Sequence, residues 1–129
     1  MEWRLLTFRS LSGRDEVGDW IRSWRKKNLA VVLAQLDDIQ RLKKEGWPPS
    51  YFSLLHGKHC AGLGEIRLKL DRVNFRIISF FGPGQGELTM LLVAVEKDWK
   101  LTPRDACEIG QRRKSEIMND RERARELGS

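Results

Sequence analysis

The chain has 129 residues, of which 40% are hydrophobic and 33% charged, and it carries a net charge of +6 with a pI near 9.7. A chain of this length is expected to form one domain, 1–129, that buries roughly two-thirds of its unfolded surface. The composition excludes a disordered chain, and the positive charge favours nucleic acid or another polyanion as partner.

Targeting and cysteine signals are weak. The first residues, MEWRLLTFRS, lack a basic segment followed by a long apolar one, and no apolar run approaches the roughly 18 residues of a membrane helix. We therefore expect a cytoplasmic protein without a secretory signal. Cys60 and Cys107 have no CxxC spacing and no ligand cluster beside them, which indicates reduced thiols, no metal and no cofactor.

The first third of the chain predicts a strand and two helices. Residues 3–8, WRLLTF, favour a strand. Ser12, with Asp15 three residues later, forms a capping-box pattern at the start of the first helix. That helix has one apolar face, made of Val17, Trp20, Ile21 and Trp24.

The second helix is expected to be capped by Asn28 and ended by Gly46, because the following Trp-Pro-Pro prevents continuation. Its apolar stripe consists of Leu29, Val32, Leu33, Leu36, Ile39 and Leu42. Two amphipathic helices so close in sequence predict an antiparallel hairpin.

From Gly64 onward the pattern has a period of two, which predicts strands. Apolar residues at 66, 68 and 70 alternate with charged ones, so one face is buried and the other is charged. Residues 73–81 form a second strand, and a glycine-rich turn, GPGQGE, leads to a third strand at 88–95.

The segment Thr102-Pro103-Arg104-Asp105 predicts the start of the last helix. It supplies an N-cap, a proline at the first helical position and an acidic residue. The helix is expected to run through Ala106, Ile109 and Ile117 and to end in a charged tail from about residue 119. Together the elements predict a single α+β domain, β-α-α-β-β-β-α. Its antiparallel sheet packs on the N-terminal helical hairpin, with a C-terminal helix.

Positive charge converges on the predicted sheet. A turn centred on Asp71-Arg72 pairs Leu68 with Phe75 and sets Arg67 opposite Arg76. At ~5 Å and an effective dielectric of about 20, the repulsion between these arginines is of order 3 kcal/mol before screening. A bound phosphate would offset that repulsion.

The segment VEKDWKLTPRD follows the third strand, which returns beside the second. Lys97 and Lys100 are therefore expected on the same side as Arg76, with Lys69 next along the first strand of the meander. Trp99 offers a base a stacking surface, worth roughly 1–3 kcal/mol. The segment is predicted to form the rim of an anion-binding groove.

Plainer interpretations of the same residues stay open. A charged sheet face is commonly just solvated, and Arg67 can pair with Glu65 or Asp71 instead of a ligand. Trp99 is equally suited to be a lid over the core. His56 and His59, in LLHGKHC, suggest a general base or metal site, but no third ligand lies nearby in sequence.

Four segments carry a family resemblance: RLKKEGWPP (41–49), LGEIR (63–67), FRIISF (75–80) and VEKDWKLTP (95–103). In this order and spacing they resemble the RelE/HigB superfamily of toxins from type II toxin–antitoxin pairs, in its phage-derived HigB-like branch. The chain departs from that branch at Gly64, where an aromatic is usual, and at Phe75 and Ser79, where tyrosines are usual. Asp98 and Leu101 stand in place of family lysines, with Lys100 displaced by one position.

The resemblance implies a metal-independent, ribosome-associated mRNA endonuclease in which the ribose 2′-hydroxyl attacks the adjacent phosphate. Arg67 and Arg76 would clamp that phosphate, while Lys97 and Lys100 would stabilise charge or assist the leaving oxygen. Flanking phosphates would meet Lys69, Arg112 and Arg113. Glu65 or a lysine would act as general base.

The implied partners are mRNA, the ribosome and a cognate antitoxin, expected to be a small helix-turn-helix protein. The alternative is a catalytically inactive relative that binds RNA, the ribosome or a partner protein. The missing tyrosines and the displaced lysine favour this alternative, whereas Arg67, Arg76 and Lys97 favour the nuclease.

Overall fold

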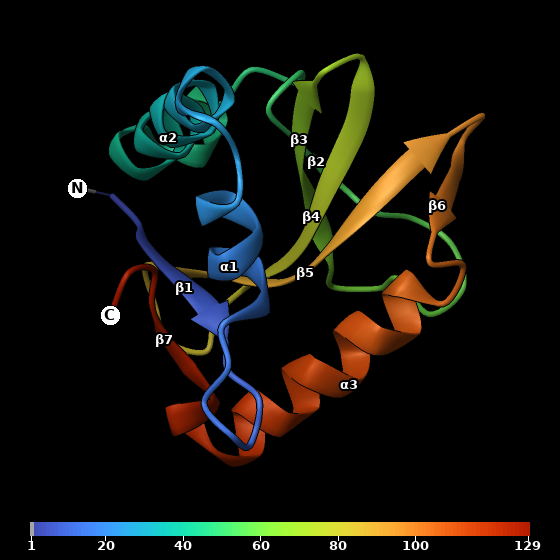
Figure 1. Cartoon of the computed structure of the whole chain (residues 1–129). Helices are drawn as coiled ribbons and strands as arrows, with labels where there is room; N and C mark the ends of the chain where they lie inside the picture. The colour runs from blue at the N-terminus through green and yellow to red at the C-terminus, as the bar shows by residue number, and fades with distance from the viewer. Residues whose placement is uncertain (1) are drawn as a thin grey trace.

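The computed structural model describes residues 2–129 and has an open β-sheet with helices on both faces (Figure 1). Six strands follow the order β2-β3-β4-β5-β1-β7, and β6 pairs with β5 off this path. All pairs are antiparallel except β1 with β5. The strands are β1 (Arg4–Phe8), β2 (Phe52–Leu54), β3 (Gly64–Leu70), β4 (Val73–Phe81), β5 (Glu87–Lys97), β6 (Lys100–Thr102) and β7 (Ala124–Glu126).

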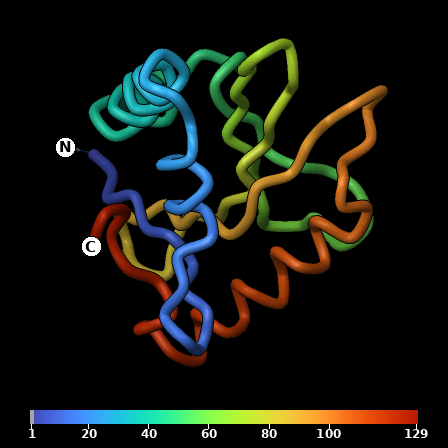
Figure 2. The backbone as a smooth tube through the Cα atoms, in the orientation of Figure 1, coloured from blue at the N-terminus to red at the C-terminus, as the bar shows by residue number. Residues whose placement is uncertain are grey.

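The helices cover opposite faces of the sheet and define two cores. α1 (Glu16–Arg22) and α2 (Lys26–Arg41) pack their apolar sides against Ile66, Leu68 and Ile77. α3 (Ala106–Asn119) packs on the other face, against a second core that includes Ile78 and Leu92. The backbone path shows α3 running beneath the sheet, well away from α2 (Figure 2). The predicted α+β class is confirmed.

The β3–β4 hairpin has the predicted register. Leu68 pairs with Phe75, and Arg67 pairs with Arg76. Asp71 and Arg72 form the turn with φ of 51° and 67°, which is the left-handed conformation that two-residue hairpin turns require. Because a two-residue turn fixes the strand register, the sequence was sufficient to align these strands.

The starts of the first two helices differ from the expectation. Asp15, not Ser12, caps α1, accepting a 2.9 Å hydrogen bond from the Gly18 amide. Ser12 lies in the preceding turn, where its hydroxyl bonds that of Ser10 at 2.9 Å. Asn28 does not cap α2, which already begins at Lys26; its side chain donates to Asp71 of the β3–β4 turn at 3.1 Å.

The ends of two helical regions also differ. α2 ends at Arg41, and Gly46 instead ends a separate 3₁₀ turn, Lys44–Gly46. Thr102 does not cap α3, because it pairs with Val95 as part of β6, and the helix begins three residues after Pro103. The local sequence predicts that Thr102 begins the helix, but this residue pairs with β5 as a strand instead.

The region beyond residue 119, expected as a charged tail, continues the fold. A 3₁₀ turn, Arg121–Arg123, leads into β7, which pairs antiparallel with β1. The Arg9 guanidinium donates to the carbonyls of Glu126 and Ser129 at 3.0 Å each. The charges of this segment are thus partly used in internal contacts, which local composition does not reveal.

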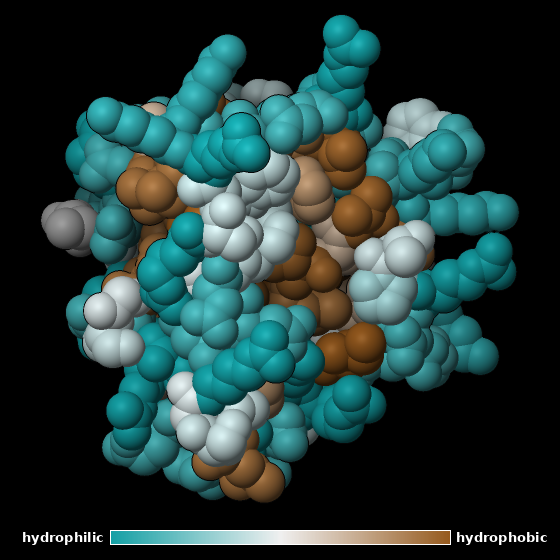
Figure 3. Space-filling view, viewed as in Figure 1, coloured by the Kyte–Doolittle hydropathy of each residue, from teal (hydrophilic) through white to brown (hydrophobic). Residues whose placement is uncertain are grey.

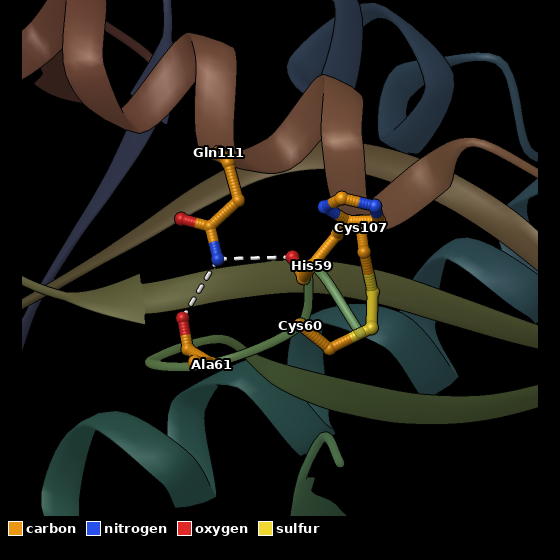
Figure 4. The surroundings of a disulfide bond; sticks show 5 residues. All are labelled: His59, Cys60, Ala61, Cys107 and Gln111. Atoms are coloured by element: carbon orange, nitrogen blue, oxygen red, sulfur yellow. Dashed lines mark hydrogen bonds between the residues drawn. A yellow bond between two sulfur atoms is a disulfide. The ribbon is translucent and has the colours of Figure 1, made fainter. Parts of the chain in front are cut away.

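Cys60 and Cys107 form a disulfide, so the prediction of reduced thiols is wrong for this structure (Figure 4). The loop between β2 and β3 folds back onto the first turn of α3, which brings together cysteines 47 positions apart. Gln111 of α3 supports the same loop, donating to the carbonyls of His59 at 3.0 Å and Ala61 at 2.7 Å. Over the described residues, no helix is both long and apolar enough to span a bilayer.

Candidate nucleic-acid interface

Arg67 of β3 and Arg76 of β4 lie side by side on the sheet face that also carries α3. They are direct partners in the strand register, and Ile66 and Ile77, their neighbours, point to the opposite face under α2. Strand alternation therefore removes both guanidinium groups from the first core. The predicted convergence of these two arginines is present.

Glu65 lies between the two arginines. Its Oε2 is 2.7 Å from Nε of Arg67 and 3.3 Å from Nε of Arg76. The side chain of Glu65 is 7% exposed and that of Arg76 13%, whereas Arg67 is 38% exposed. A carboxylate of the chain itself thus offsets the repulsion for which the sequence argument invoked a bound phosphate. Asp71, the other suggested partner, bonds Asn28 instead.

The three charged side chains form the floor of a groove of about 520 Å³, which we call the arginine groove. One wall comes from β2 and the loop after it, and the other from the β5–β6 hairpin. Beyond the floor residues, its lining comprises Ser53, Leu54, Leu55, His56, Cys60, Glu96, Trp99 and Leu101. The groove therefore combines a recessed positive pair with two carboxylates and an indole.

A second hollow of about 240 Å³ adjoins the arginine groove and extends it along β3. Arg67 and Arg76 line both hollows, and Lys69, Asn74 and Ser50 line only the second. Lys69 is exposed and follows Arg67 on the same strand face. The expectation that Lys69 lies next to the arginine pair is met, which gives a continuous basic track.

Lys97 and Lys100 do not join this track. Arg76 pairs with Ala94, so Glu96, two residues on, shares its face, and Leu101 pairs with Glu96. Lys97 and Lys100 pair with each other and point to the opposite face. The prediction that these lysines lie on the same side as Arg76 is wrong, because side chains alternate between the two faces of the sheet along β5.

Trp99 is not a lid over the core. It is 95% exposed at the tip of the β5–β6 hairpin, where Asp98 and Trp99 have φ of 52° and 66°. The two-residue turn projects the indole over one rim of the arginine groove, whose lining includes it. An indole in this position is free to stack on a ligand.

The surface view in Figure 3 shows a mostly hydrophilic outline, with hydrophobic residues gathered near the centre of this face.

The two arginines of α3 differ. Arg112 is exposed. Arg113 has a side chain only 19% exposed; it donates to the Leu91 carbonyl at 2.8 Å and to Glu16 at 3.1 Å. Its guanidinium also lies 5.0 Å from the centre of the Phe8 ring. Arg113 is thus occupied in joining α3 to the sheet and to α1.

The histidines give no catalytic constellation. His56 lines the arginine groove, whereas His59 has φ of 67° in the exposed loop and contributes its carbonyl to Gln111. Among residues 2–129, no group of three or more metal-ligating side chains comes together.

Sequence reasoning missed Glu96 and the loop wall. The signal for Glu96 was available, because the alternation that buries Ala94 puts residue 96 on the same face. The wall formed by Leu55, His56 and Cys60 had no local signal, because its position depends on contact with α3.

Comparison with known proteins identifies a family. The profile of the family described as Phage derived protein Gp49-like matches residues 19–115, from within α1 to within α3, and so includes every residue of the arginine groove. Searches among curated proteins and among solved structures gave no match. The matched family is toxin-like, within the RelE-like type II toxins. This chain therefore belongs to the Gp49-like family of phage-derived proteins.

Proposed function

We propose that this chain is the toxin of a type II toxin–antitoxin pair and acts as a metal-independent, ribosome-associated endoribonuclease on mRNA. The observation that carries the proposal is the pair Arg67–Arg76, with Arg76 recessed, at the floor of a groove open to solvent. Membership of a toxin-like phage-derived family supports the toxin role.

The reaction would be attack of the ribose 2′-hydroxyl on the adjacent phosphate, leaving a cyclic phosphate and a free 5′-hydroxyl. Negative charge builds on the phosphorane, and guanidinium groups stabilise it by two-pronged hydrogen bonds. Arg67 and Arg76 would hold the non-bridging oxygens. A phosphate that enters must compete with Glu65 for both guanidinium groups.

Proton transfer would fall to a carboxylate of the groove. Glu65 accepts a hydrogen bond from Arg67 and forms a longer ion pair with Arg76, so its principal role would be to position them. Glu96 also lines the groove, is half-buried, and makes no ion pair within residues 2–129. We assign Glu96 as the candidate general base, with Glu65 as the alternative.

Other residues would bind RNA without touching the reacting atoms. Lys69 would contact a flanking phosphate, and Trp99 would stack on a base. Lys97 and Lys100, on the far face of the hairpin, are assigned to contacts with more distant phosphates of mRNA or ribosomal RNA instead of the leaving oxygen. We also assign Arg112 to RNA binding. Arg113 is not assigned to it, because its guanidinium is already engaged by Leu91 and Glu16.

A second function is favoured by the neutralisation of the arginine pair by Glu65 and the outward placement of both lysines. On this alternative the chain is a catalytically inactive relative that binds RNA, the ribosome or a partner protein. Both functions require a partner for the groove. For the toxin, that partner is a cognate antitoxin, expected to be a small helix-turn-helix protein encoded by the neighbouring reading frame.

Expression of this chain alone in a bacterium is expected to arrest growth and to shorten messages, because a groove without antitoxin meets abundant ribosomes. Growth curves and mapping of RNA 5′ ends measure the two effects. Soluble, folded protein with normal growth and intact messages would favour the binding-only function.

RNA affinity is expected to fall steeply with salt. If three phosphates contact the basic track, affinity should fall by roughly twentyfold between about 50 and 200 mM salt, because bound counterions are released. Fluorescence anisotropy with a labelled single-stranded RNA measures this. Lys69→Gln should reduce the slope, and a flat response in the unmodified chain would mean that the basic face is only solvated.

A further inference from the structure

The loop that connects β2 to β3, residues 55–63, forms one wall of the arginine groove. Leu55, His56 and Cys60 contribute its lining, opposite Trp99 and Leu101 of the β5–β6 hairpin. The apolar Leu55 and Cys60 also pack on the second core beside α3. The shape of the groove thus depends on where this loop is held.

Leu63, at the end of the loop, is buried in the second core, and few contacts hold the residues before it. The backbone hydrogen bonds from Leu55 to Leu63 at 2.9 Å and from Cys60 to Gly57 at 3.2 Å lie within the loop itself. Two hydrogen bonds from Gln111 connect it to α3, and residues 56–59 are exposed. The disulfide between Cys60 and Cys107 is therefore the strongest tie between this wall and α3 (Figure 4).

The disulfide is placed for exchange with small thiols. Cys60 is partly accessible, whereas Cys107 is 8% exposed and is the second residue of α3. A thiolate that attacks the Cys60 sulfur forms a mixed disulfide and releases Cys107 as thiolate, which the helix N-terminus stabilises. A second thiolate attacks the mixed disulfide at the reagent sulfur, giving the oxidised reagent and free Cys60. Oxidation by a small disulfide reverses these steps.

We propose that the Cys60–Cys107 pair is a redox switch for the arginine groove. The disulfide fixes residues 55–63 as a wall and preorganises the groove, and reduction releases the loop and weakens RNA binding, since binding must then order it again. The binding consequence rests on the proposed function; the release of the loop does not. Under this switch the oxidised form binds RNA more tightly. The reduced form, which a bacterial cytoplasm favours, binds several-fold more weakly and still reaches ribosomes on overexpression.

Hydrogen exchange on the full chain tests the release of the loop. After incubation with dithiothreitol, amides of residues 55–63 are expected to exchange roughly tenfold faster than after incubation with oxidised glutathione, because local opening no longer breaks a covalent tie. Amides in the middle of β3 to β5 serve as the internal control and should not change. Equal exchange of the loop in both conditions would overturn the proposal.

RNA binding tests the consequence. The probe is a short fluorescein-labelled 2′-O-methyl RNA, which cannot react through its 2′-oxygen. Its affinity is expected to be at least roughly fivefold lower for the reduced protein than for the oxidised one. The double variant Cys60→Ser, Cys107→Ser should match the reduced protein under both conditions, and equal affinity of oxidised and reduced wild type would overturn control of binding by the disulfide.

The two measurements separate this proposal from the proposed function. RNA binding to neither form would contradict the proposed function, and the exchange result alone would then decide whether the loop is released. If the double variant does not fold, the reduced wild-type protein supplies the same comparison.

Discussion

Arg76→Ala is expected to lower RNA cleavage, or toxicity on expression, by about two orders of magnitude or more. Arg76 is the recessed member of the pair, directly opposite Arg67 in the register, and its removal takes away half of the phosphate clamp. Arg76→Lys should recover only part of the activity, because an ammonium cannot reproduce a two-pronged guanidinium contact. Single-turnover cleavage, normalised to folded protein, measures the effect.

The Arg76→Ala variant is also expected to lose some stability. Glu65 keeps its 2.7 Å contact with Arg67 when Arg76 is removed, so Arg76→Ala should cost about 1–2 kcal/mol of unfolding free energy. The control is Arg22→Ala, on α1 away from the groove, where the side chain is 53% exposed and little change is expected. Full activity of a folded Arg76→Ala protein would contradict the site as assigned.

Glu65→Ala is expected to destabilise the fold by about 2–4 kcal/mol, because two adjacent guanidinium groups lose the carboxylate between them. The partial exposure of Arg67 keeps the effect below that of a fully buried pair. Urea denaturation measures the free energy of unfolding. An anion should replace the lost carboxylate, so inorganic phosphate is expected to raise the Tm of this variant more than that of the unmodified chain.

A matched control is available for Glu65→Ala. Glu122 also pairs with an arginine, Arg125, at 3.2 Å, but its side chain is 80% exposed. Glu122→Ala should change stability by no more than about 0.5 kcal/mol. If phosphate stabilises the Glu65 variant no more than the unmodified chain, the arginine pair does not bind phosphate in the absence of Glu65.

The sequence by itself determined the features that follow from local rules. The period-two pattern and the turn at Asp71-Arg72 fixed β3, β4 and their register, and hence the meeting of Arg67 with Arg76. Helical periodicity placed the buried residues of α1 and α2, but Leu33 and Leu42 of the predicted stripe are exposed, and Leu42 lies beyond the end of α2. These features were predictable because a two-residue turn and a helical repeat involve residues close in the chain.

Only the tertiary structure decided which groups complete the site. Packing against α3 carries the loop with Cys60 to Cys107 and makes it a wall of the groove. Strand alternation beyond Ala94 turns Glu96 toward the arginines and Lys97 away from them. In the same way, pairing with β1 gives the charged C-terminal segment a strand, β7. Such contacts join residues far apart in sequence, and their geometry depends on the whole packed sheet, so no short stretch of sequence encodes them.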